Sequence, residues 1–240
     1  MFIGKTAATA AEKECRIMNI SAFFEHLDGL FRAGQIDQVE PYILNQLVSA
    51  NQEKDREASL AIINELIGFY RSQQRYDEAI RVTQQALDLC RNEYIIGSLA
   101  HATTLLNGAT AYRFAGQSAK ALEMFHEAEA IYKEKLSPID SHWGGLYNNM
   151  SAACGDLGRF DEAADYLLRA AAVMDAQPGH VIEAAVTHAN LAGLYFKQQN
   201  YFGAKQHIAT ACNMLEGRPE AARQYAEFQA MKETLDKYPG

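Results

Sequence analysis

A ten-residue pattern recurs five times along this chain, and no other feature of the sequence limits the possible folds as strongly. Each copy runs through a break made of Gly or Gln-Gln and closes on an alanine, which the first copy replaces with valine. The copies occupy positions 30–39, 70–79, 112–121, 154–163 and 195–204. Self-similarity at a fixed period, here about 40 residues, indicates stacked supersecondary units.

The residues of each copy predict two amphipathic helices joined by a tight turn. Asp77 and Asp161 stand where an N-cap or first-turn acid belongs, at the positive end of a helix dipole. Small residues seven positions apart lie on one helix face, where they let a neighbouring helix approach closely. The second helices place alanines in this way after the closing alanine, at Ala86, Ala128, Ala170 and Ala211. We therefore expect closely packed helical hairpins.

The pattern resembles the tetratricopeptide repeat, in which Leu-small-x-x-Tyr is followed by Gly, then Tyr-Asp-Glu-Ala and a second Ala. Residues 159–163 and 190–195 carry this resemblance most clearly, and it extends over residues 20–215. The unit is longer than the standard one of about 34 residues and lacks its usual closing proline, which makes it similar to the repeats of kinesin light chains and of bacterial peptide-sensing regulators. The resemblance implies an all-α fold: a right-handed α-α superhelix of about five helix-turn-helix repeats with a C-terminal capping helix.

We expect one repeat domain over residues 1–240. The repeats are expected at about 20–54, 55–95, 96–137, 138–178 and 179–217, and the capping helix at 218–238. Tyr225, Phe228, Met231 and Leu235 give that last helix an apolar face, with which it can cover the fifth repeat. Residues 5–18 could form another short helix or an unfolded leader, and the sequence leaves both open.

Charge and cysteine content narrow the class of partner. The formal charge is −8, from 22 basic and 30 acidic side chains, and a negative surface repels phosphate backbones. The four cysteines, at positions 15, 90, 154 and 212, are too far apart for a CxxC motif and are expected to be reduced and structural. Residues 1–20 lack a secretory signal, and no apolar run is as long as a membrane-spanning helix requires. We predict a cytoplasmic protein that binds neither nucleic acid nor membranes; the oligomeric state is not predicted.

A search for reactive constellations gives no candidate catalytic residue, metal ligand or cofactor site. The seven histidines are scattered over different repeats, without the HExxH spacing that places two ligands on one helix face. The paired acids Asp77-Glu78 and Asp161-Glu162 recur with the repeat, so helix starts explain them. We predict that the chain is not an enzyme and carries no cofactor or metal.

A column of asparagines is the strongest functional signal. Asn107, Asn149 and Asn190 occupy the same place in successive copies, at a constant distance before the closing alanine; Glu65 stands there in the copy before, and Asn64 and Asn148 adjoin the column. Asn is unfavourable inside helices, which suggests that these side chains are used. The resemblance implies that asparagine here grips the main chain of a bound peptide, since an amide both donates and accepts. The alternative is that these side chains bridge adjacent repeats.

Basic side chains stand near the ends of the same helices, except in the copy that contains Asn149, which has Gly155 and Asp156 there. Arg71, Arg113 and Lys197 should lie on or beside the inner surface of the superhelix, where they could select a partner with an acidic segment or a terminal carboxylate. The alternative is that they are solvated and only favour the negative ends of their helix dipoles.

The predicted function is a protein- or peptide-binding module, or scaffold, that uses the groove of the superhelix. Two alternatives remain: a regulatory sensor of a small signalling peptide, and a non-catalytic subunit of an enzyme complex.

Overall fold

The computed structural model describes residues 18–92 and 95–239, and this part of the chain contains eleven α-helices and no strand. The all-α prediction is therefore confirmed. Ten of the helices form consecutive pairs: α1 (Ile20–Arg32) with α2 (Ile36–Glu53), α3 (Arg56–Ser72) with α4 (Tyr76–Asn92), α5 (Leu99–Phe114) with α6 (Ser118–Lys135), α7 (His142–Asp156) with α8 (Phe160–Asp175), and α9 (Val181–Lys197) with α10 (Tyr201–Leu215).

A last helix, α11 (Ala222–Leu235), follows the fifth pair, and short 3-10 turns precede α9 and α11. Leu235 is buried, and Tyr225, Phe228 and Met231 pack against the apolar cluster of α9 and α10. The helix therefore covers the end of the stack, as its apolar face predicts. Cys15 and the segment proposed for a short leading helix, apart from Met18, lie outside the described residues.

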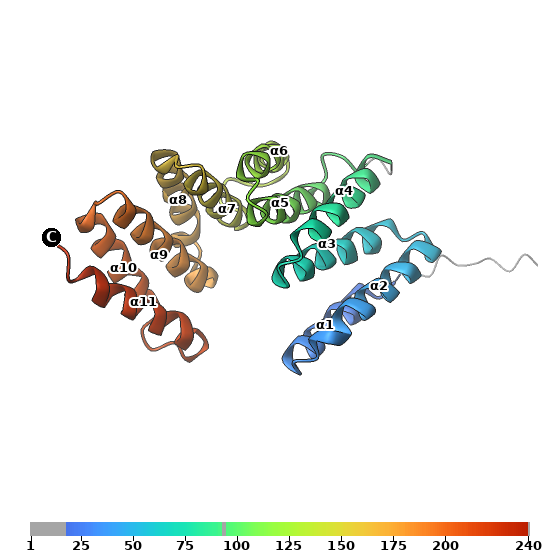
Figure 1. The fold of residues 1–240 in the computed structure, drawn as a ribbon, viewed down its shortest axis with the longest axis horizontal. Helices are drawn as coiled ribbons and strands as arrows, with labels where there is room; N and C mark the ends of the chain where they lie inside the picture. The colour runs from blue at the N-terminus through green and yellow to red at the C-terminus, as the bar shows by residue number, and fades with distance from the viewer. Residues whose placement is uncertain (1–17, 93–94, 240) are drawn as a thin grey trace, which may run out of the picture.

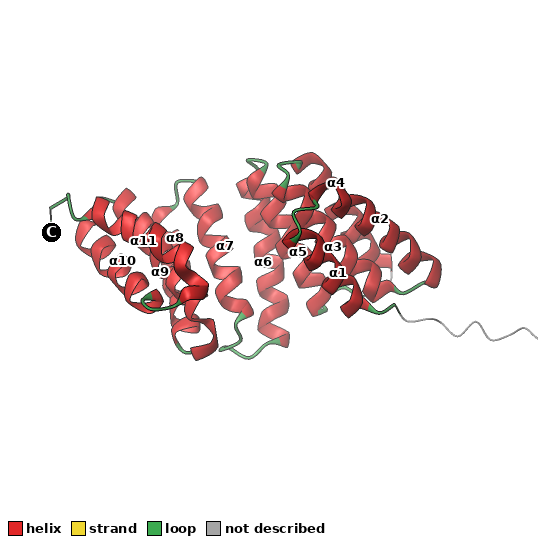
Figure 2. Ribbon diagram, turned by 90° about the horizontal axis from the view of Figure 1, so that it is seen from below, coloured by secondary structure: helices red, strands yellow, loops and turns green. Residues whose placement is uncertain are grey.

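The helix pairs follow one another along a curve, from α1 and α2 at one end to α10 and α11 at the other (Figure 1). Helix α6 lies on the outer side of this curve, while α5 and α7 lie on its inner side. Helix α3 packs against α5 as well as against its hairpin partner α4. In the second view the described chain is again a row of helices joined by short loops (Figure 2). Of these helices, none is long and apolar enough to cross a bilayer.

The ten-residue pattern closes all five hairpins in one way. The backbone N–H of its sixth residue donates to the C=O of its first, over 2.8 to 3.0 Å. This bond requires a left-handed backbone conformation at the fifth position. Glycine adopts that conformation without strain, and other residues adopt it at a cost of about 1 kcal/mol. The φ angles there are 68° at Gly34, 58° at Gln74, 77° at Gly116, 74° at Gly158 and 60° at Gln199. The Gln-Gln copies thus make the same turn as the Gly copies.

The paired alanines of the second helices are packing residues. Each of them has 0% of its surface exposed: Ala79, Ala86, Ala121, Ala128, Ala163, Ala170, Ala204 and Ala211. Because these side chains are small, neighbouring helices approach closely at these positions, and a larger side chain would have no room there. This close approach fixes the stacking of the pairs. Cys90, Cys154 and Cys212 are free and buried in the same interior, as expected for structural thiols.

Candidate functional site

The asparagine column lies on the inner helices and connects adjacent repeats. In α3, Asn64 Nδ2 donates to Leu60 O and to Thr104 Oγ1 in α5, each at 3.0 Å. Asn107 Nδ2, one turn further along α5, donates to Asn64 Oδ1 at 3.0 Å. One buried asparagine therefore links the second and third helix pairs through two neighbouring side chains.

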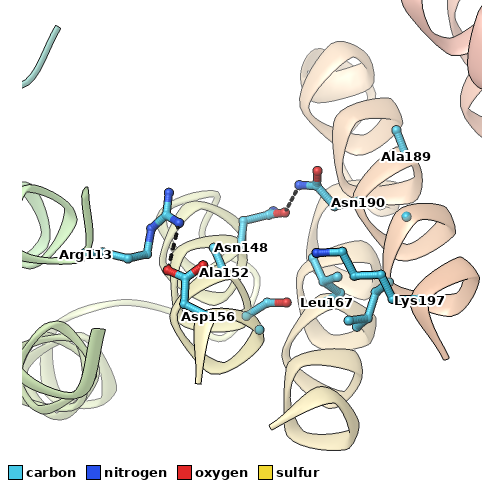
Figure 3. Close-up of a pocket in the computed structure, with 12 residues that line it drawn as sticks. Arg113, Asn148, Ala152, Asp156, Leu167, Ala189, Asn190 and Lys197 are labelled. Atoms are coloured by element: carbon cyan, nitrogen blue, oxygen red, sulfur yellow. Dashed lines mark hydrogen bonds and ion pairs between the residues drawn. The ribbon is translucent and has the colours of Figure 1, made fainter. Parts of the chain in front are cut away.

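The same arrangement recurs between the fourth and fifth pairs. Asn148 Nδ2 donates to Thr187 Oγ1 at 2.8 Å and to Gly144 O at 2.9 Å, and Asn190 Nδ2 donates to Asn148 Oδ1 at 3.0 Å. Figure 3 shows the Asn148–Asn190 bond at the edge of a pocket. The bridging alternative thus has direct contacts at Asn107 and Asn190.

Asn149 differs from its two counterparts. Its amide donates to Gly145 O of its own helix at 3.0 Å. In the second and fourth pairs the bridging partner, Asn64 or Asn148, lies one residue before the column position. The corresponding residue of α5 is Leu106, so α5 offers Asn149 no amide to bridge to. Asn107 and Asn190 each keep an amide oxygen without a hydrogen bond in the described part of the chain. Contact with a ligand therefore stays a prediction for the column.

One pocket on the inner side of the curve gathers four of the sequence-predicted residues. It has a volume of about 360 Å³ and is formed by α5, α7 and α9 with Leu167 of α8. We call it the C-terminal pocket; its polar lining comes from Arg113, Asn148, Ser151, Asp156, Asn190 and Lys197 (Figure 3). Asn149 and Arg71 are not part of its lining.

The charged groups of the C-terminal pocket are only partly compensated. Arg113 Nη1 lies 3.1 Å from Asp156 Oδ2, and Ser118 Oγ donates to that same oxygen at 2.9 Å. Arg113 Nε is buried and is the one buried side-chain polar atom without a hydrogen bond among the described residues. Lys197 is exposed and has no ion pair in that part of the chain. Lys197 can therefore still donate to an anionic or carbonyl oxygen in the pocket.

Arg71 belongs to the same basic group, although it lies outside the pocket lining. Burial, and next the nearby Arg113 charge, lower the pKa of Arg71. Two guanidinium groups thus repel each other on the inner surface, and an anion bound between them would relieve that repulsion.

A second inner pocket lies towards the other end of the curve. Of the sequence-predicted residues it includes Asn64 and Asn107, and sequence reasoning missed the rest of its lining. It has a volume of about 500 Å³ and lies between α1, α3 and α5. We call it the N-terminal pocket. Phe24, Leu60, Ala61 and Ile95 give it an apolar wall, and its polar lining is formed by Glu57, Asn64, Glu65, Ser98, Thr103 and Asn107.

Glu65 is the unusual charge of the N-terminal pocket. It is half-buried, and it makes no hydrogen bond or ion pair within residues 18–92 and 95–239. Burial, and next the charge of Asp28, raise the pKa of the Glu65 carboxyl. The alignment of repeats places Glu65 in the asparagine column, but only the structure shows that no cation among the described residues compensates it.

Two of the seven histidines come together in one place that the sequence did not reveal. His188 Nδ1 lies 2.9 Å from His207 Nδ1, and His188 Nε2 lies 3.3 Å from both carboxylate oxygens of Asp175. Burial, and next the charge of His188, lower the pKa of His207. No group of three or more His, Cys, Asp or Glu residues in the described chain could hold a metal ion. The cluster joins α8, α9 and α10 and lies outside both pocket linings.

Comparison with known proteins gives a sequence match and several similar folds. A family model described as the tetratricopeptide repeat matches residues 58–134. No curated protein matches the chain. BtubC (BKLC) from P. vanneervenii is 19% identical with a TM-score of 0.72, over 81% of this chain and 80% of that one.

Two further solved structures have the same fold. A kinesin light chain protein from Podosopora anserina with nearly identical TPR-like repeats is 16% identical, with a TM-score of 0.66 over 85% of this chain and 96% of that one. A signal transduction ATPase from Pyrococcus horikoshii with a tetratricopeptide repeat sensor is 16% identical, with a TM-score of 0.72 over 90% of this chain and 32% of that one. The tetratricopeptide repeat model thus matches residues 58–134, and the described chain shares the repeat fold of these solved structures.

Proposed function

We propose that this chain is a non-catalytic protein-interaction module that holds a segment of a partner protein on the inner side of its curve. The repeat fold is that of a protein-interaction scaffold. The observation that carries the finer proposal is the pair of pockets on the inner helices, each of which includes an amide from the asparagine column.

The bridging contacts prepare these amides for a ligand. Because Asn107 and Asn190 each use Nδ2 on the neighbouring repeat, their rotamers are already fixed. Binding then loses little side-chain entropy, and each Oδ1 can accept a backbone N–H of an extended segment. Bridging between repeats and binding of a partner are therefore compatible roles for the same side chain.

A charge reversal at Lys197 tests the proposal. The partner is captured from cell extract, identified and purified, and its affinity is measured calorimetrically for the wild type and for Lys197→Glu. Lys135→Glu is the matched control, since Lys135 is an exposed lysine in the last turn of the outer helix α6. A charged hydrogen bond contributes about 1.5–3 kcal/mol, so Lys197→Glu should weaken binding by roughly tenfold or more.

Lys135→Glu should leave the affinity unchanged within about twofold. If both variants bind the partner as the wild type does, or if Lys135→Glu alone weakens it, the partner does not occupy the inner surface at the C-terminal pocket, and the proposal fails in this form.

A further inference from the structure

The two inner pockets carry opposite charge. Glu57 and Glu65 line the N-terminal pocket, and the charge of Asp28 acts on Glu65 from α1. Arg113 and Lys197 line the C-terminal pocket. Helix α5 contributes to both pockets, with Thr103 and Asn107 in one and Arg113 in the other, so a single extended segment lying across α5 can reach both.

The N-terminal pocket is complementary to a cation with an apolar stem. The Glu65 carboxylate is partly removed from water and has no cation near it in the described chain, so its charged form is disfavoured. One wall of the same pocket is apolar, and Phe24 in that wall is 37% exposed. Lysine and arginine place their methylenes on apolar surface and their charge at its edge, and a cation also gains from an aromatic face.

The C-terminal pocket is complementary to a carboxylate. Asp156 compensates one edge of the Arg113 guanidinium, which leaves Nε buried without an acceptor. Lys197 adds a second positive charge to the same lining. A carboxylate of a ligand would meet two basic side chains here, whereas a lysine would be repelled.

We propose that the inner surface selects a partner segment of divided charge: a lysine or arginine next to a large apolar residue in the N-terminal pocket, and aspartate or glutamate in the C-terminal pocket. This inference rests on the proposed function and refines it. A segment that is acidic throughout would place a like charge against Glu65. The N-terminal pocket therefore disfavours such a segment as well as favouring one that carries a lysine or arginine.

Selection from random peptides tests this directly. Phage-displayed 16-residue peptides are selected on the wild-type protein, and the enriched peptides are synthesised with a fluorescent label. Anisotropy then gives their affinities for the wild type, Glu65→Gln and Lys197→Gln. The control variants Glu134→Gln and Lys135→Gln make the same charge changes at exposed positions of the outer helix α6.

The enriched peptides should carry a basic and apolar half and an acidic half. Glu65→Gln and Lys197→Gln should each weaken them by roughly ten- to a hundredfold, and the controls by less than about twofold. Replacing the basic residue of the peptide with norleucine should abolish the effect of Glu65→Gln but leave that of Lys197→Gln.

The outcomes separate this inference from the proposed function. Enriched peptides that are acidic throughout, or that bind Glu65→Gln as well as the wild type while Lys197→Gln weakens them, overturn the divided charge and leave the proposed function standing. If no peptide is enriched, or if neither pocket variant weakens any enriched peptide, the proposed function fails together with the inference.

Discussion

Gly108 lies where α5 crosses α4, and its replacement by alanine is a sharp test of the packing described above. A Cβ atom at Gly108 would lie 2.2 Å from Thr83 Cγ2 and 3.1 Å from Thr83 Oγ1. Thr83 has 0% of its surface exposed, and its hydroxyl donates to Ala79 O at 2.8 Å. Because a β-branched side chain has few rotamers, Thr83 cannot turn away without losing that bond, and the two helices must move apart.

The expected magnitude is the sum of two opposing effects. Overpacking of a core costs about 1–3 kcal/mol. Alanine in place of a helical glycine returns about 1 kcal/mol. Gly108→Ala should therefore lower the free energy of unfolding by about 0–2 kcal/mol. Gly68 of α3 is the matched control, since nothing lies within 4 Å of a Cβ there, and Gly68→Ala should stabilise the protein by up to about 1 kcal/mol.

Urea denaturation followed by circular dichroism measures both variants, which should differ by about 1–3 kcal/mol with unchanged m-values. Thr83→Ser removes the colliding methyl group and keeps the hydroxyl, so the double variant Thr83→Ser/Gly108→Ala should recover most of the loss. An equal rise in the denaturation midpoint for Gly68→Ala and Gly108→Ala would refute the close approach of α4 and α5.

Two further predictions concern the inner helices and the histidine cluster. Asn148→Ala removes the hydrogen bonds to Thr187 and from Asn190, so it should lower the free energy of unfolding in urea by about 1–3 kcal/mol. Asn149→Ala should lower it little, because Asn149 bonds only within its own helix. Equal losses would contradict the bridging role. Since the pKa of His207 is lowered from 6.5, the unfolded chain binds that proton more tightly, and stability should fall as the pH drops below about 6.5. His207→Gln should flatten this part of the pH profile of unfolding, and an unchanged slope would show that His207 does not cause it.

The fold could be predicted because its determinants are local. Each ten-residue copy contains both the left-handed turn position and the first of two interface alanines, so one copy encodes a closed hairpin and its packing face. Repetition at a constant spacing then requires the hairpins to stack. The Gln-Gln copies could be recognised as turns for the same reason, although glutamine is an unusual left-handed residue.

The contacts of the asparagine column could not be predicted by alignment of the repeats. Alignment of the repeats at equal spacing matches Asn107 with Glu65. Because of the rotation of the helices, however, Asn107 donates its hydrogen bond to Asn64, one residue earlier. The recurrence of Asn with a Thr one repeat later, at Thr104 and Thr187, was the available signal. Whether Glu65 has a cation beside it depends on α1 and α5 together, which no single repeat specifies.

Site-specific photocross-linking shows whether a partner lies on the inner surface. The photoreactive residue p-benzoylphenylalanine is placed at Ala152, which lines the C-terminal pocket on α7, and in a second variant at Ala130, which is exposed on the outer helix α6. Both variants are irradiated with the purified partner that the wild type captures. We expect an adduct from Ala152 and none from Ala130. An adduct from Ala130 alone would contradict binding on the inner surface.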